Sequence, residues 1–165
     1  MKLKILAAAA VLVLLIAGGV LFGHKPAAPD VSFSTLHGQS FRTADLRGQV
    51  VLVNFWATTC TACIAEMPAL KTTQDKFQGR GYRTVAVAMD YDPPARVGAF
   101  VGLNPLPFTF VLDRDGSIAR GFDDVRLTPT SFILNKRGEI VHKILGAPDF
   151  DELHALIDRL LAEPT

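Results

Sequence analysis

The chain has 165 residues, of which 49% are apolar and 20% charged, with a formal net charge of +1. These values are ordinary for a globular protein, and the length predicts a single domain. Residues 1–25 hold three lysines and no acid, so residues 26–165 carry 14 basic and 16 acidic side chains and a net charge of −2. This balance argues against a nucleic-acid partner. Two cysteines are too few for a disulfide scaffold.

The N-terminal segment predicts export. Lys2 and Lys4 precede an uncharged apolar run over residues 5–22. As a helix this run spans about 27 Å, close to the bilayer core of roughly 30 Å. We predict an uncleaved signal anchor over residues 1–22, with a cleaved signal peptide as the alternative. Either way the lysines stay in the cytoplasm. The rest of the chain is therefore expected to be exported.

Residues 23–30 form the predicted tether, because Gly23, Pro26 and Pro29 disfavour regular structure. Residues 31–165 form the predicted domain. Its first part, through residue 48, is expected to contain a short hairpin that turns at His37-Gly38 and leads into the central strand.

Strands and helices then alternate. Residues 50–57 form a nearly continuous apolar run of β-branched and aromatic residues, typical of a strand buried on both faces. Apolar residues recur at helical spacing over residues 64–77, and an apolar strand follows over residues 82–89. A second helix, from Asp92-Pro93-Pro94 through Val101, and a strand over residues 108–112 complete another β-α-β step.

The C-terminal part predicts a hairpin and a helix. Strands over residues 130–134 and 139–145 flank a turn that ends in Gly138, and Asp149 caps an amphipathic helix through Leu161. The whole pattern predicts an α/β fold with a central mixed sheet flanked by helices. The segment Asp113-Arg114-Asp115-Gly116 begins like a calcium loop but lacks its later oxygen ligands, so it is predicted to be a surface turn.

The chemistry concentrates in Cys60-Thr61-Ala62-Cys63, which directly follows the buried strand and opens a helix. A sulfur at the positive end of a helix favours the thiolate, the species that attacks disulfides. We predict that Cys60 is the exposed nucleophile and that Cys63 resolves the mixed disulfide, leaving an intramolecular disulfide. This redox-active pair needs no bound cofactor, and no flavin or nicotinamide site is visible.

Three other interpretations of the cysteine pair remain. A static disulfide closing so short a loop adds little stability. Two unpaired buried thiols are also possible. A metal site would need histidines, and the four in the chain show no ligand spacing: His24, His37, His142 and His154. No metal is therefore expected.

The segment from Asn54 to Pro68, NFWATTCTACIAEMP, resembles the active-site segment of the TlpA/ResA branch of the thioredoxin superfamily. These are exported, membrane-tethered thiol-disulfide oxidoreductases. The resemblance implies that this chain is located in the bacterial inner membrane, with its catalytic domain facing the periplasm or extracytoplasmic space. Further support comes from Thr128-Pro129, which precedes the strand beginning at Thr130. The resemblance extends over most of residues 30–162. It implies a thioredoxin-like fold with an N-terminal hairpin extension and an inserted helix-strand.

The resemblance also implies roles for two further residues. Glu66 lies about one helical turn after Cys63, where its carboxylate could exchange a proton with the resolving thiol; the alternative is a solvated first-turn glutamate. Asn54 stands where ordinary thioredoxin has a buried acid, which favours Glu66 as the proton acceptor. Pro129 is expected to follow a cis peptide bond beside the cysteine pair, and the alternative is a plain proline at the first residue of a strand.

Client proteins are expected to bind around the cysteine pair. The Thr128 backbone is free to pair with an incoming extended peptide. Thr59 replaces an aromatic residue common in the family, which gives a smaller and more polar rim. Thr61 and Ala62 influence the balance of thiolate and disulfide, and Trp56 packs below the site.

The expected activity is the reduction of disulfides in exported client proteins, such as apocytochrome c or a copper-delivery protein. Electrons would come from another membrane oxidoreductase. One alternative is a thiol peroxidase, although Ala57 stands where that chemistry normally uses a threonine. Another is a copper-binding module that uses Cys60, Cys63 and His142.

Overall fold

The computed structural model describes residues 25–164. The predicted anchor, residues 1–22, lies outside the described residues and stays a prediction, as does the boundary of the tether. Within residues 25–164, no helix has both the length and the hydropathy needed to cross a membrane.

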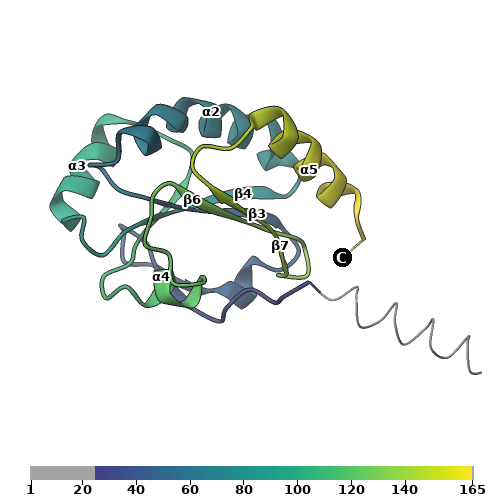
Figure 1. The fold of residues 1–165 in the computed structure, drawn as a ribbon, viewed down its shortest axis with the longest axis horizontal. Helices are drawn as coiled ribbons and strands as arrows, with labels where there is room; N and C mark the ends of the chain where they lie inside the picture. The colour runs from purple at the N-terminus through teal and green to yellow at the C-terminus, as the bar shows by residue number, and fades with distance from the viewer. Residues whose placement is uncertain (1–24, 165) are drawn as a thin grey trace, which may run out of the picture.

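The core is a five-stranded mixed sheet in the order β5-β4-β3-β6-β7 (Figure 1). The strands are β3 (Val50–Trp56), β4 (Tyr82–Ala88), β5 (Thr109–Leu112), β6 (Thr130–Leu134) and β7 (Ile140–Leu145). The first three are parallel, whereas β6 pairs antiparallel with both β3 and β7. This arrangement confirms the predicted thioredoxin-like α/β fold.

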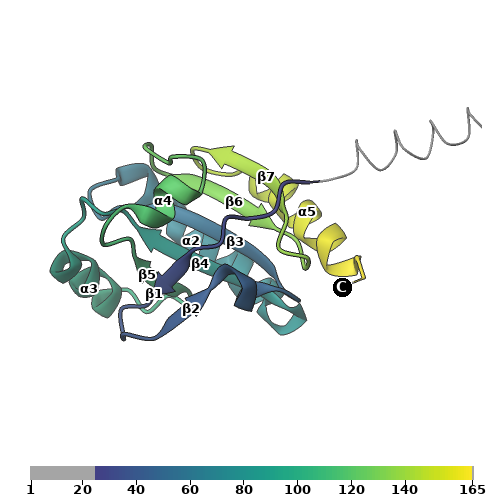
Figure 2. The same ribbon diagram turned by 90° about the horizontal axis from the view of Figure 1, so that it is seen from below.

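Helices cover one face of the sheet, and a short helix and a hairpin cover the other (Figures 1 and 2). On the first face lie α2 (Thr61–Phe77), α3 (Pro94–Leu103) and α5 (Phe150–Ala162). On the second face lie α4 (Ser117–Gly121) and the predicted hairpin of β1 (Ser32–Ser34) and β2 (Ser40–Arg42). Residues 25–164 also form two short 3-10 helices, η1 (Thr43–Leu46) and η2 (Gln78–Arg80).

Strand β3 lies between two hydrophobic layers, which explains its continuous apolar run. Val53 and Phe55 pack with the α4 face, whereas Leu52 and Trp56 pack with the helices on the opposite face. Since successive side chains of a strand point to opposite faces, all seven residues of β3 are buried. The strand ends at Trp56, and the turn that follows carries the cysteine pair.

The turn predicted at residues 113–116 is present, but its first and last residues, Asp113 and Gly116, are buried, so the prediction of a surface position is wrong for these two. Asp113 is buried, and its carboxylate accepts hydrogen bonds from the backbone N–H groups of Ile118 (3.0 Å) and Ala119 (2.8 Å). These bonds satisfy free N–H groups at the start of α4, a helix of five residues that the sequence analysis did not predict. Asp113 is therefore a structural residue of the core.

Part of the predicted tether is attached to the domain. Ala28 donates its N–H to the Gly138 carbonyl, and Ile140 donates to the Pro26 carbonyl, both at 2.8 Å. This pairing lies at the turn between β6 and β7. That turn is at the opposite end of the sheet from Trp56, because β6 begins beside the end of β3 and runs away from it.

Candidate active site

Cys60 and Cys63 are joined by a disulfide at the start of α2. The turn before the helix is closed by a 3.0 Å hydrogen bond from the Cys60 N–H to the Ala57 carbonyl. Cys60 is the N-cap residue of α2, and its sulfur accepts a hydrogen bond from the Cys63 N–H at 3.1 Å. In the reduced protein, a donor at this position and the helix dipole both favour a thiolate on Cys60.

The two sulfur-bearing residues differ in access. Cys60 is partly exposed and has exposed neighbours in Thr59, Thr61 and Ala62, whereas Cys63 is fully buried. An incoming disulfide can therefore reach Cys60 but not Cys63. A cysteine pair with one accessible and one enclosed sulfur is suited to two-step exchange through a mixed disulfide.

Glu66 lies one turn further along α2 and is 4% exposed, so the interpretation as a solvated glutamate is wrong. Its Oε1 accepts a 2.9 Å hydrogen bond from the Asn54 amide, which also donates to Ser131 at 3.0 Å. Glu66 Oε2 has no protein hydrogen-bond partner among the described residues. Burial raises the pKa of Glu66 to about 7, and the Asn54 hydrogen bond opposes this shift. A carboxyl group with this pKa can exchange a proton near neutral pH.

Trp56 is enclosed within the domain. Its ring packs against Phe100 and Phe110, with centroids 5.1 Å and 5.7 Å away, in the same cluster as Cys63. Its side chain is fully buried. Trp56 therefore supports the base of α2 through packing.

The Thr128-Pro129 peptide bond is cis, as the resemblance implies. Thr130 pairs with Phe55, which places Pro129 at the same end of the sheet as the turn that carries Cys60. Pro129 is buried and Thr128 partly exposed. The Tyr91 hydroxyl lies 3.5 Å from Thr128 Oγ1, which brings the loop after β4 to the same place.

Sequence reasoning missed Asp92 as a residue of this site. Asp92 is 3% exposed, and its carboxylate accepts two hydrogen bonds from Thr58, which lies two positions before Cys60. The sequence marked Asp92 only as the start of a helix. Asp92 and Thr58 lie 34 positions apart, and no sequence spacing predicts a contact between them. An acid directly before two prolines does, however, indicate a defined loop.

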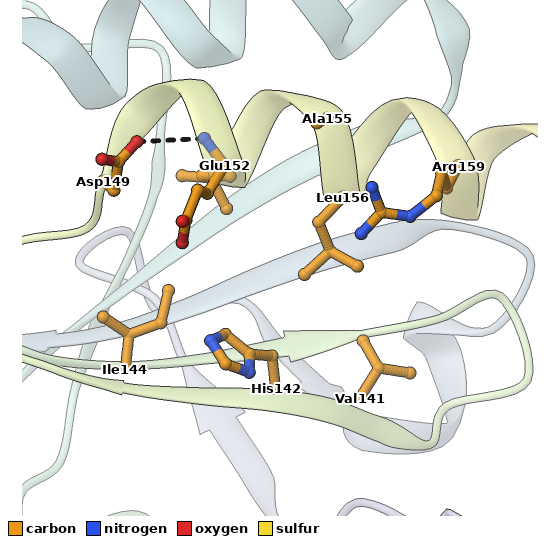
Figure 3. Close-up of a pocket in the computed structure, with 9 residues that line it drawn as sticks. Val141, His142, Ile144, Asp149, Glu152, Ala155, Leu156 and Arg159 are labelled. Carbon is orange, nitrogen blue, oxygen red and sulfur yellow. Dashed lines mark hydrogen bonds between the residues drawn. The ribbon is translucent and has the colours of Figure 1, made fainter.

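A separate hollow of about 410 Å³ lies between β7 and α5 (Figure 3). His142 lines it from β7, and Leu156 and Arg159 line it from α5. His142 pairs with Ile133, which in turn pairs with Leu52, four residues before Trp56. The structure thus places His142 away from the cysteine pair and does not assemble the copper site considered above. Residues 25–164 contain no group of three or more His, Cys, Asp or Glu side chains that could hold a metal ion.

The Redoxin family profile matches residues 24–157, which include the whole sheet and the cysteine pair. The chain belongs to the Redoxin family. Among curated relatives of this Redoxin protein, thiol-disulfide oxidoreductase ResA of a Bacillus cereus strain is 31% identical over 133 residues, which cover 81% of this chain and 76% of ResA. Thioredoxin-like protein YneN of Bacillus subtilis is 32% identical over 135 residues, or 79% of this chain and 76% of YneN.

Solved structures agree with these matches. A thioredoxin-type protein from Neisseria meningitidis has a TM-score of 0.76 and 36% identity, covering 83% of this chain and 91% of that one. The structure of MTB dsbF has a TM-score of 0.73 and 28% identity, and the match covers 83% of this chain and 99% of that one. With its Cys-x-x-Cys pair, this Redoxin-family protein is a thiol-disulfide oxidoreductase of the thioredoxin type. The TlpA/ResA-like resemblance is confirmed.

Proposed function

We propose that this protein reduces disulfides of exported client proteins through its cysteine pair. The observation that carries the proposal is the Cys60–Cys63 disulfide at the start of α2, with Cys60 accessible and Glu66 buried on the same helix. Apocytochrome c or a copper-delivery protein is the client class that the TlpA/ResA resemblance implies.

The cycle begins with the reduced protein. The Cys60 thiolate attacks one sulfur of the client disulfide, and the second client sulfur leaves as a thiolate and takes up a proton. Cys63 then attacks Cys60 Sγ, which breaks the mixed disulfide and releases the client sulfur that Cys60 had attacked; this sulfur leaves as a thiolate and takes up a proton from solvent. Glu66 accepts the proton that Cys63 loses. The client gains two electrons and two protons, and the Cys60–Cys63 disulfide remains.

The burial of Glu66 and the lack of a protein partner for its Oε2 among the described residues support its role as the proton acceptor. Glu66 is one helical turn from Cys63, both side chains are buried, and Glu66 Oε2 has no protein partner within residues 25–164. Its raised pKa of about 7 makes the carboxylate a stronger base than an exposed glutamate. Proton acceptance is most effective when the pKa of the base lies near the working pH.

Exposed apolar side chains around Pro129 support a docking surface for an extended client segment. Tyr91 is 56% exposed and Leu127 is 71% exposed, and Leu145, also exposed, pairs with Thr130. We propose that the Thr128 backbone pairs with the client chain beside its disulfide. The neighbouring apolar side chains then favour clients with apolar residues next to the cysteine.

The attachment of residues 26–28 fits an anchored domain in the periplasm. These residues pair with the β6–β7 turn (Figure 2). That turn lies at the end of the sheet opposite to Trp56, after which the chain reaches the cysteines. With residues 1–22 as a bilayer anchor, the cysteine pair would face away from the point where the chain leaves the membrane. A membrane oxidoreductase is the proposed electron donor, with no bound cofactor in this chain.

The proposal is tested by the redox equilibrium of Cys60 and Cys63 in the detergent-solubilised full chain, titrated against glutathione and a dithiol buffer. A reversible couple near about −270 mV supports a reductase, whereas a value near about −120 mV indicates a donor of disulfides. Absence of a reversible couple would overturn thiol-disulfide exchange. Rapid consumption of hydrogen peroxide would favour the thiol peroxidase alternative.

A further inference from the structure

The loop between β4 and α3 is joined to the active-site turn through one buried carboxylate. Asp92 Oδ2 accepts a hydrogen bond from the Thr58 backbone N–H at 2.6 Å, and Asp92 Oδ1 accepts one from the Thr58 hydroxyl at 2.7 Å. Both carboxylate oxygens thus bind the same residue. A hydrogen bond to a charged acceptor is stronger than one between neutral groups, and two parallel bonds also fix orientation.

Thr58 lies inside the turn that sets the position of Cys60. The turn runs from Ala57 to Cys60 and is closed by the Cys60 N–H bond to the Ala57 carbonyl. Thr59 is exposed and Cys60 only partly covered, so packing alone gives this segment little restraint. A backbone segment that is released from such a restraint gains conformational entropy, so the turn would sample other positions.

Asp92 is itself held in place, so it can act as a fixed support. Its N–H donates to the Met89 carbonyl at 3.0 Å, and the Met89 N–H donates to the Trp56 carbonyl at 3.0 Å. The loop is thereby attached to the end of β3, next to the turn that it restrains. Asp92 is 3% exposed, and water therefore has little access to replace it.

We propose that Asp92 is a positioning residue for Cys60. By holding Thr58, it keeps Cys60 at the N-cap of α2 when the disulfide is open, with its sulfur directed at the Cys63 N–H. Asp92 touches neither client nor sulfur and acts only through the turn. The inference rests on exchange at Cys60 and does not depend on the client or on the direction of electron flow.

Two substitutions separate the position of the turn from the charge of the carboxylate. In Asp92→Asn the side-chain oxygen can still accept the Thr58 N–H bond, and the amide nitrogen can donate to the Thr58 hydroxyl oxygen. In Asp92→Ala both bonds are lost. Asp90→Ala is the matched control, because Asp90 is an exposed acid on the same loop and makes no hydrogen bond to Thr58 among the described residues.

The experiment uses the full chain in detergent and two readouts. One is the rate at which the reduced protein attacks a small chromogenic aryl disulfide, and the other is the equilibrium constant for forming the 60–63 disulfide against glutathione. We expect Asp92→Ala to slow the attack about tenfold and to shift the equilibrium about tenfold toward the dithiol, because a loose turn closes the disulfide less readily. Asp92→Asn should stay within about threefold of the wild type in both readouts, and Asp90→Ala should match it.

Wild-type rate and equilibrium in a folded Asp92→Ala protein would show that Asp92 only stabilises the fold, and would overturn the inference. Equal impairment in Asp92→Asn and Asp92→Ala would also overturn it, since charge and not position would then matter. If Asp92→Ala does not fold, Thr58→Val decides. This change removes only the hydroxyl bond, and we expect an attack about threefold slower, restored by Thr58→Ser. An unchanged rate in Thr58→Val would contradict the inference.

Discussion

The Asn54 side-chain amide donates a hydrogen bond of 2.9 Å to Glu66 Oε1, which connects the central strand β3 to the active-site helix α2. Asn54 is fully buried and cannot ionise, so it supplies a donor without adding a charge. Glu66 is thus the only carboxyl group of this pair. Its pKa of about 7 follows from burial, only partly offset by the Asn54 bond.

Removing the carboxylate should slow the second step of exchange. We expect Glu66→Gln to reduce the rate of mixed-disulfide resolution by about 10²-fold at pH 7, the low end for loss of a general base. Attack by Cys60 should change much less. Rapid acid quenching followed by mass spectrometry would measure the mixed disulfide as it accumulates. Glu152→Gln, at an exposed site on α5, is the control, and an equal resolution rate in Glu66→Gln and wild type would remove Glu66 from the mechanism.

The raised pKa of Glu66 also predicts how the stability of the oxidised protein depends on pH. Between the ordinary value of 4.5 and about 7, the folded state binds a proton that the unfolded state has lost. The free energy of unfolding should therefore fall as the pH rises through this range, by at most about 3 kcal/mol. Urea unfolding at pH 5 and pH 8 would measure this fall in the free energy of unfolding. The fall should be smaller in Glu66→Gln; identical pH dependence in the two proteins would contradict the assignment.

A second buried acid beside Glu66 should change the protonation of Glu66. In Asn54→Asp, two carboxyl groups would share one buried site, and like charges disfavour ionisation. We expect the pKa of Glu66 to rise above its present value of about 7 and resolution at neutral pH to slow by several-fold. The pH profile of single-turnover resolution would detect the shift. Asn54→Ala controls for loss of the amide, and a profile that stays at the wild-type position in Asn54→Asp would argue against coupling of the two sites.

The difference in access between the two sulfurs predicts which variant traps a client. Cys63→Ser should accumulate a stable mixed disulfide through Cys60, because no thiol remains to resolve it. Cys60→Ser should trap little, since Cys63 is fully buried. Non-reducing electrophoresis of the full chain incubated with a disulfide-bonded protein would show the adduct. Stronger trapping by Cys60→Ser would reverse the assigned roles.

The exposed side chain of Leu127 should contribute to client binding without affecting the chemistry. We expect Leu127→Ser to raise KM for a disulfide-bonded peptide with apolar flanking residues by about threefold to tenfold, as for loss of about 1 kcal/mol of apolar burial. The rate with a small aryl disulfide should not change. Leu103→Ser is the matched control, because Leu103 is 83% exposed at the end of α3. Equal KM values in both variants would place client binding elsewhere.

Local sequence determined the elements that build the site. The apolar run of β3 requires cover on both faces of the strand. The cysteine pair directly follows this strand and lies at the start of α2, a placement that depends only on neighbouring residues. Asp149 caps α5 as predicted, because an N-cap bond involves only neighbouring residues. The hairpins and the order of strands and helices follow in the same way from short-range patterns.

Only the tertiary structure decided the environment of those elements. The two bonds from Thr58 to Asp92 and the bond from Asn54 to Glu66 join residues 34 and 12 positions apart, and no local pattern marks them. Helix α4 is too short to show a helical period, and it depends on the buried Asp113 carboxylate. Sequence thus placed the sulfurs at a helix start, whereas packing between distant segments determines the burial of Glu66 and the support of the turn that carries Cys60.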